Sequence, residues 1–179
     1  MQAKAILKFW FEEIETKKWW VKDPEFDQLI LSRFGEIHAQ AVKSELFSWR
    51  SKAQDQLAEI IILDQFSRNI YRDTPSAFAT DPLALALAQA AIEKGFDHKL
   101  PPRERAFMYM PFMHSESRLI HEISLKLFQA EEVSGNLDFA IKHKAIIDRF
   151  GRYPHRNQIL GRSSTPEEIA FLKEPNSSF

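Results

Sequence analysis

One stretch of the chain, residues 143–162, gathers the side chains best suited to bind an anion or to move a proton. It reads HKAIIDRFGRYPHRNQILGR and contains two histidines, four arginines and an asparagine around two glycines and one proline. Arginine presents five donors in a fixed arrangement, asparagine adds an amide, and histidine titrates near neutral pH. The stretch therefore predicts a site for an anion or a carboxylate, without naming a reaction.

A helix is expected to end inside this stretch, at Gly151. Residues 152–157 then turn into a short helix, whose first backbone N–H groups could meet an anion. The candidate ligand-binding residues here are His143, Arg152, Arg156 and Asn157, with His155 as a candidate catalytic residue. Four arginines cannot share one helix face, so at least one of them points elsewhere. The alternative interpretation is a buried salt-bridge hub that joins helices.

A second polar motif, LDQFSRNIYR at residues 63–72, places an aspartate one helical turn before an arginine. Asp64 and Arg68 can pair if the segment is helical. Asp64 follows four apolar residues, 60–63, and is expected to be at least half buried, where an unpaired charge is costly. The pair is interpreted either as a structural ion pair at the helix end or as an aspartate-oriented arginine that faces a ligand.

A third motif, PFMHSE at residues 111–116, combines a proline with a histidine and a glutamate. His114 could act as a general base or as a donor, and Glu116 lies at the next helix start, where the helix dipole favours anions. A capping role beside a partly buried histidine is the alternative. We expect the three motifs to converge, since each lies at a helix end and antiparallel hairpins bring alternate ends to the same side.

Helical spacing of apolar residues dominates the chain, and strand-like alternation is hard to find. Pro111 is expected to end or kink a helix. The pattern predicts an all-α fold of seven to nine helices, arranged as antiparallel hairpins in one domain over residues 1–179. Proline and capping signals predict helix starts near Pro24, Ser51, Pro82, Pro102, Ser115 and Pro166.

Composition argues against several classes of function. A net charge of -1 argues against a nucleic-acid partner, although a local basic patch remains compatible with it. The chain has no cysteine, and it contains neither HExxH nor a Glu-x-x-His pair, so no metal and no other cofactor is expected. No secretory signal is visible, and no apolar run approaches the roughly 20 residues that span a bilayer. We therefore expect a cytoplasmic protein without a membrane partner.

Four segments together resemble one known group: ILDQFSRNIYR, AFATDPLAL, RAFMYMPFMHSES and the run HxxIIxRFGRYPHRNxxLGRxSTPEE. Over nearly its whole length the chain is similar to the bacterial family catalogued as domain of unknown function 924, and the RFGRYPHRN block is highly specific. The resemblance implies an all-α fold related to tetratricopeptide-like superhelical arrays. It implies no established activity.

Two functions from different classes follow from these observations. The first is a small-molecule binding protein, with catalysis left open, whose polar pocket holds a small anionic or carboxylate ligand. The alternative is a tetratricopeptide-like interaction module that binds a peptide or a partner protein in a groove. The N-terminal aromatic residues at 9–11, 19 and 20 are expected in the core or in a hairpin contact, with a peptide groove as the alternative. A homo-oligomer is left open.

Overall fold

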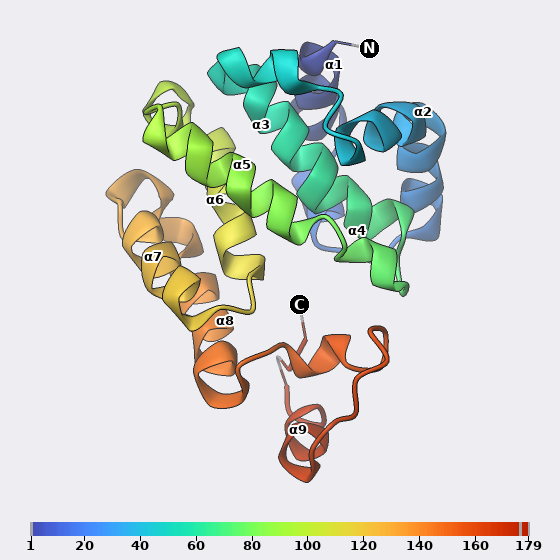
Figure 1. Cartoon of the computed structure of the whole chain (residues 1–179), viewed down its shortest axis with the longest axis vertical. Helices are drawn as coiled ribbons and strands as arrows, with labels where there is room; N and C mark the ends of the chain where they lie inside the picture. The colour runs from blue at the N-terminus through green and yellow to red at the C-terminus, as the bar shows by residue number, and fades with distance from the viewer. Residues whose placement is uncertain (1, 176, 179) are drawn as a thin grey trace.

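The computed structural model describes residues 2–175, 177 and 178, and the regular secondary structure of this part of the chain is all helical, without a strand (Figure 1). The α-helices are α1 (Ala3–Lys8), α2 (Pro24–Val42), α3 (Ala53–Ile61), α4 (Ser67–Ile70), α5 (Asp81–Glu93), α6 (Pro102–His114), α7 (Arg118–Phe128), α8 (Leu137–Phe150) and α9 (Pro166–Phe171). A π-helical turn at Ile62–Phe66 joins α3 to α4 in one continuous helix. The predicted all-α fold is confirmed.

Helices that are neighbours in the chain also pack against each other in space. The pairs α5 with α6, α6 with α7, and α7 with α8 are in contact, and α3 packs on both α1 and α5. Figure 1 shows α2 to α5 in one large body, from which α6, α7 and α8 lead to the segment that carries α9. A superhelix of the tetratricopeptide type stays a prediction. Within the described residues, no helix is long and apolar enough to cross a membrane.

Several helix ends lie where local signals place them. Asp23 caps α2 by accepting hydrogen bonds from the backbone N–H groups of Glu25 and Phe26. Thr165 and Glu168 form both halves of a capping box at α9. Gly151 ends α8 with a φ of 71°, a left-handed conformation that costs glycine least.

Three expected helix boundaries are wrong in detail. α3 begins after Lys52, because the Ser51 hydroxyl donates to the Ser48 carbonyl instead of capping the helix. α7 is capped by Ser117, two residues beyond the serine that the sequence suggests. Pro111 does not end α6, which continues to His114. Residues 106–113 of α6 are buried on all sides, so tertiary packing overrides the cost of an internal proline.

The core is centred on the continuous helix of α3 and α4. Its residues from Ile60 to Phe66 are buried, and they lie against aromatic rings of the N-terminal segment, among them Trp10 at 5.5 Å from the Phe66 ring. Phe9 and Phe11 are buried too, as expected. Trp20 lies outside the core, with 62% of its residue surface exposed, and its ring contacts those of Trp19 and Phe107.

Candidate functional site

Two of the three polar motifs meet in a buried aspartate–histidine pair. Asp64 lies in the π-helical turn, and His114 is the last residue of α6, 50 positions further along the chain. The Nδ1 atom of His114 is 2.7 Å from Oδ1 of Asp64. The Asp64 side chain is 1% exposed and the His114 side chain 17% exposed. The prediction that Asp64 is buried and paired with an arginine is confirmed, because Nη1 of Arg68 lies 3.3 Å from it.

The π-helical turn that presents Asp64 is held by buried hydroxyl groups. Ser67 and Thr80 each donate a hydrogen bond of 2.7 Å to the carbonyl oxygen of Leu63. Nε2 of His38 lies 2.8 Å from the Ser67 hydroxyl. A π turn displaces carbonyls from the regular helical ladder, and such turns are frequent at functional sites. The sequence gives no signal for this network, because its members come from three separate segments.

Two arginines converge on one carboxylate beside this pair. Arg68 binds Asp81 through two contacts of 2.9 and 3.0 Å, and Nη1 of Arg156 lies 3.2 Å from the same carboxylate. Sequence reasoning treats Asp81 as the cap of α5. The residue preceding α5 is Thr80, which makes no side-chain cap, and the Asp81 side chain binds the arginines instead. Asp81 is therefore a site residue that sequence reasoning missed.

The stretch at residues 143–162 supplies an arginine enclosed by aromatic rings. The guanidinium of Arg156 lies 4.5 Å from the Phe78 ring centroid and 4.6 Å from the Tyr153 ring centroid. Among the described residues, neither the buried Nε of Arg156 nor the buried Nδ1 of His155 has a hydrogen-bond partner. Burial raises the pKa of Tyr153, so its hydroxyl stays protonated and donates to the carbonyl of Met113.

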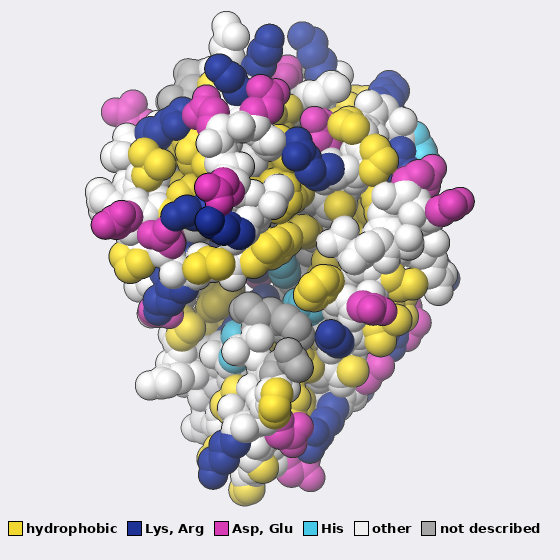
Figure 2. Space-filling model, turned by 180° about the vertical axis from the view of Figure 1, so that it is seen from behind, with side chains coloured by type: hydrophobic (Ala, Val, Ile, Leu, Met, Phe, Trp, Pro, Cys, Tyr) yellow, Lys and Arg dark blue, Asp and Glu magenta, His cyan; other side chains and the backbone are white. Residues whose placement is uncertain are grey.

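The histidines of the cluster differ in their surroundings. The ring of His143 lies 6.5 Å from that of His114 and 5.9 Å from that of Tyr153, and the ring of His155 lies 5.5 Å from Tyr153. Burial lowers the pKa of His143 to about 3. Burial, followed by the positive charge of Arg156, lowers the pKa of His155 to about 4. Both imidazoles are therefore neutral near pH 7. Figure 2 shows histidine side chains at the waist between the larger body and the narrower lower part.

These two neutral histidines should make stability depend on pH. Their folded pKa values lie below the ordinary value of 6.5, so the unfolded chain binds more protons between about pH 4 and 6.5. The contribution of these histidines to the free energy of unfolding is fully present above about pH 6.5. It falls on acidification by up to about 1.4 kcal/mol per pH unit for each histidine. Urea unfolding at a series of pH values measures this slope. His143→Gln or His155→Gln should reduce the slope.

Other candidate residues form ion pairs and hydrogen bonds with residues outside the candidate set. Glu116 accepts two hydrogen bonds from Arg162, at 2.6 and 2.9 Å, and one from the backbone N–H of Tyr153. Arg152 donates to both carboxylate oxygens of Glu168, at 2.7 and 2.8 Å. These contacts tie the segment after α8 to the start of α7 and to α9.

Asn157 links the two ion pairs. Its Nδ2 lies 3.2 Å from Glu168, and its Oδ1 accepts from Nε of Arg162 at 3.0 Å. Sequence reasoning did not select Glu168 or Arg162 as site residues. The candidates thus divide into a buried group around Asp64 and His114 and a closed network around Glu116, Arg152 and Asn157.

Comparison with known proteins identifies the family. A family model described as a bacterial protein of unknown function, DUF924, matches residues 6–176. The solved structure of a protein of unknown function, ATU0120 from Agrobacterium tumefaciens, is 40% identical to the chain, with a TM-score of 0.90 over 96% of each chain. Comparison with curated proteins gives no match. The chain therefore belongs to the bacterial family DUF924.

Proposed function

We propose that the chain binds a small carboxylate-bearing molecule at the Asp64–His114 pair and that His114 exchanges a proton with it. The observation that carries this proposal is the convergence of that pair with Arg68, one helical turn after Asp64, and with Arg156, which reaches Asp81 from the segment after α8. An aspartate-oriented histidine beside two guanidinium groups combines a proton carrier with anion recognition.

Asp64 has the properties required to orient a proton-exchanging histidine. Burial by itself raises the pKa of Asp64, but the nearby His114 and Arg68 lower it by more. The pKa therefore lies below its ordinary value, and the carboxyl is ionised. Because Asp64 holds Nδ1 of His114, Nε2 is the nitrogen left for a ligand. The negative charge of Asp64 also stabilises the imidazolium that forms when Nε2 accepts a proton.

The two arginines supply the recognition of a carboxylate. The single negative charge of Asp81 forms ion pairs with both guanidinium groups. Arg68 also forms an ion pair with Asp64. Burial and the neighbouring Arg68 lower the pKa of Arg156, although arginine stays charged in proteins. A ligand carboxylate could accept from the unpartnered Nε of Arg156 and relieve the repulsion between the two cations.

The closed network has a different role in this proposal. Glu116, Arg152 and Asn157 have their polar side-chain atoms bonded within the protein, so they hold the segment that carries His155 and Arg156 in place. They then position the binding residues without contacting the ligand. This division favours a small-molecule site over a groove that binds an extended peptide.

Titration with acetate tests the binding step. Acetate should raise the melting temperature more than chloride does at equal ionic strength, because only a carboxylate offers two acceptor oxygens to the arginines. Arg156→Lys keeps the charge but loses the Nε donor, and it should weaken acetate binding by about tenfold or more. Arg149→Ala, at an exposed arginine on α8, is the matched control and should change nothing.

Further measurements separate a ligand site from a structural network. The side-chain NMR signals of His114 should shift on addition of acetate, and the apparent affinity should fall as salt rises. His114→Gln should abolish the proton exchange while leaving the fold intact by circular dichroism. Equal effects of acetate and chloride, or an Arg156→Lys variant with unchanged affinity, would refute the proposal.

A further inference from the structure

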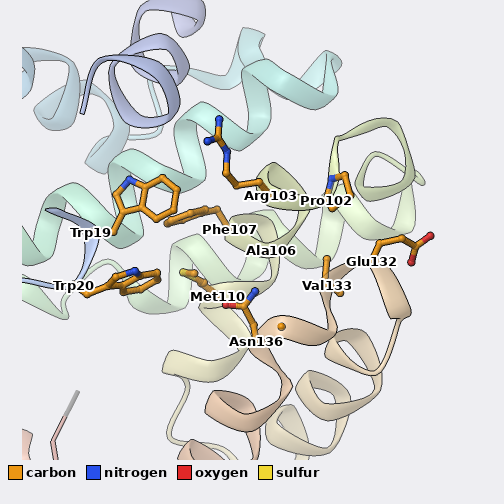
Figure 3. A pocket seen from close by; sticks show the side chains of 11 residues that line it. Trp19, Trp20, Pro102, Arg103, Ala106, Phe107, Met110, Glu132, Val133 and Asn136 are labelled. Atoms are coloured by element: carbon orange, nitrogen blue, oxygen red, sulfur yellow. The ribbon is translucent and has the colours of Figure 1, made fainter. Parts of the chain in front are cut away.

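A second cleft lies on α6, on a face of that helix formed by Pro102, Arg103, Ala106, Phe107 and Met110. Its volume is about 310 Å³, within the range of small-molecule sites. Figure 3 shows the aromatic side chains of Trp19 and Trp20 on one side of the cleft. Glu132, Val133 and Asn136 lie on the other side. None of these residues belongs to the Asp64–His114 site.

Three aromatic rings make one end of this cleft. The ring of Trp20 is nearly parallel to that of Phe107, with an interplanar angle of 13° and centroids 6.2 Å apart. The ring of Trp19 stands at 88° to the first and at 77° to the second. The indole N–H of Trp19 donates to the carbonyl of Trp10 at 3.0 Å, which fixes that ring in place. Trp20 keeps its large exposed surface available to a ligand.

Arg103 and Glu132 together give the cleft no net charge, and each opposes an ionic ligand of its own sign. The guanidinium of Arg103 already lies 6.0 Å from the Trp19 ring centroid and 5.1 Å from that of Phe11, and it donates to the Phe11 carbonyl. A second cation near these rings would be repelled by Arg103. An anion would meet the carboxylate of Glu132 and the negative faces of the aromatic rings.

One polar group of the cleft suits a hydrogen-bonding edge. Asn136 precedes α8, but its side chain makes no capping bond to that helix. Its amide therefore has a donor and an acceptor to offer at the cleft. We propose that this cleft binds a flat, uncharged aromatic or heteroaromatic group of about the size of indole, with the ring against Trp20 and Phe107. This site is separate from the carboxylate site proposed above.

Titration of the full chain with 5-fluoroindole, followed by 19F NMR, tests this inference. We expect saturable line broadening and a weaker response to 5-fluorotryptamine, which carries a positive charge. Trp20→Ala should weaken 5-fluoroindole binding by about fivefold or more, as stacking on an aromatic ring implies. Trp20→Phe should restore most of the affinity, because it restores a ring face.

Two controls keep this test separate from that of the carboxylate site. Phe47→Ala, at a residue 71% exposed and outside the cleft, should leave 5-fluoroindole binding unchanged. His114→Gln should also leave it unchanged, so failure of either site can be recognised alone. The inference is overturned by unsaturable broadening, by equal binding of Trp20→Ala, or by equal affinity for the cation. It is also overturned if sedimentation shows self-association that Trp20→Ala abolishes, because the cleft would then be a contact between copies.

Discussion

Replacing Asp64 by alanine should lower the free energy of unfolding by about 3–5 kcal/mol, the usual cost of breaking a buried ion pair on one side. The carboxylate is 1% exposed, and it binds His114 at 2.7 Å and Gln65 at 2.5 Å. Its loss would leave Arg68 with only Asp81 as a charged partner and would leave a void in the π-helical turn. Urea unfolding followed by circular dichroism measures the change.

Asp64→Asn separates the charge from the shape in this experiment. Asparagine keeps the size of the side chain and an acceptor for His114, so the loss should be smaller than with alanine. Glu36→Ala, at an exposed position of α2, is the surface control and should stay within about 0.5 kcal/mol of the wild type. An Asp64→Ala variant as stable as the wild type would show that the pair does not stabilise the fold.

Replacing Glu168 by alanine should cost about 3 kcal/mol of stability, as expected for a buried carboxylate whose partners are left unpaired. The side chain is 3% exposed and binds Arg152, Asn157 and the backbone N–H of Thr165. Arg152 is 29% exposed, so water can rehydrate it, which places the cost at the lower end of the range for buried pairs. Thermal unfolding compares the variant with Glu167→Ala, at the exposed neighbour, which should melt like the wild type.

The Glu168 interaction also has a definite pH dependence. The hydrogen bond from Arg152 is the main cause that lowers the pKa of Glu168 to about 2, from an ordinary value of 4.5. The contribution of this interaction to the free energy of unfolding is therefore fully present above about pH 4.5 and is lost as the pH falls towards 2. Glu168→Ala and the wild type should differ less at pH 2.5 than at pH 7. An equal difference at both pH values would contradict the assigned ion pair.

Local sequence signals predicted those features that depend on residues within one helical turn. The caps at Asp23 and Thr165 and the end of α8 at Gly151 all involve such near neighbours. The capping signals at Ser51 and Ser115 were misleading, because a serine hydroxyl can form another local hydrogen bond instead of capping the helix. Pro111 failed as a helix end because packing around α6 decides its length.

The site was only partly visible in the sequence. Burial of Asp64 and its contact with Arg68 followed from apolar neighbours and helical spacing. The partners that complete the site did not, because Asp81 carried the signature of a helix cap and no local signal connects Phe78 with Arg156. Likewise, arginine and asparagine occur both in ligand sites and in internal networks, so the residue types of Arg152 and Asn157 did not show which of the two they form.

The sequence by itself determined the helical class, most helix starts and the polar motifs, since periodicity and capping act over a few residues. The tertiary structure alone decided which charges from distant segments pair. His114 meets Asp64 across 50 positions, and Arg156 meets Asp81 across 75. Such contacts depend on how the helices pack, and a charge finds its partner only where packing excludes water from both. That selection left His155 and Arg156 each with a buried nitrogen atom that has no hydrogen-bond partner among the described residues, and it closed the network around Glu168.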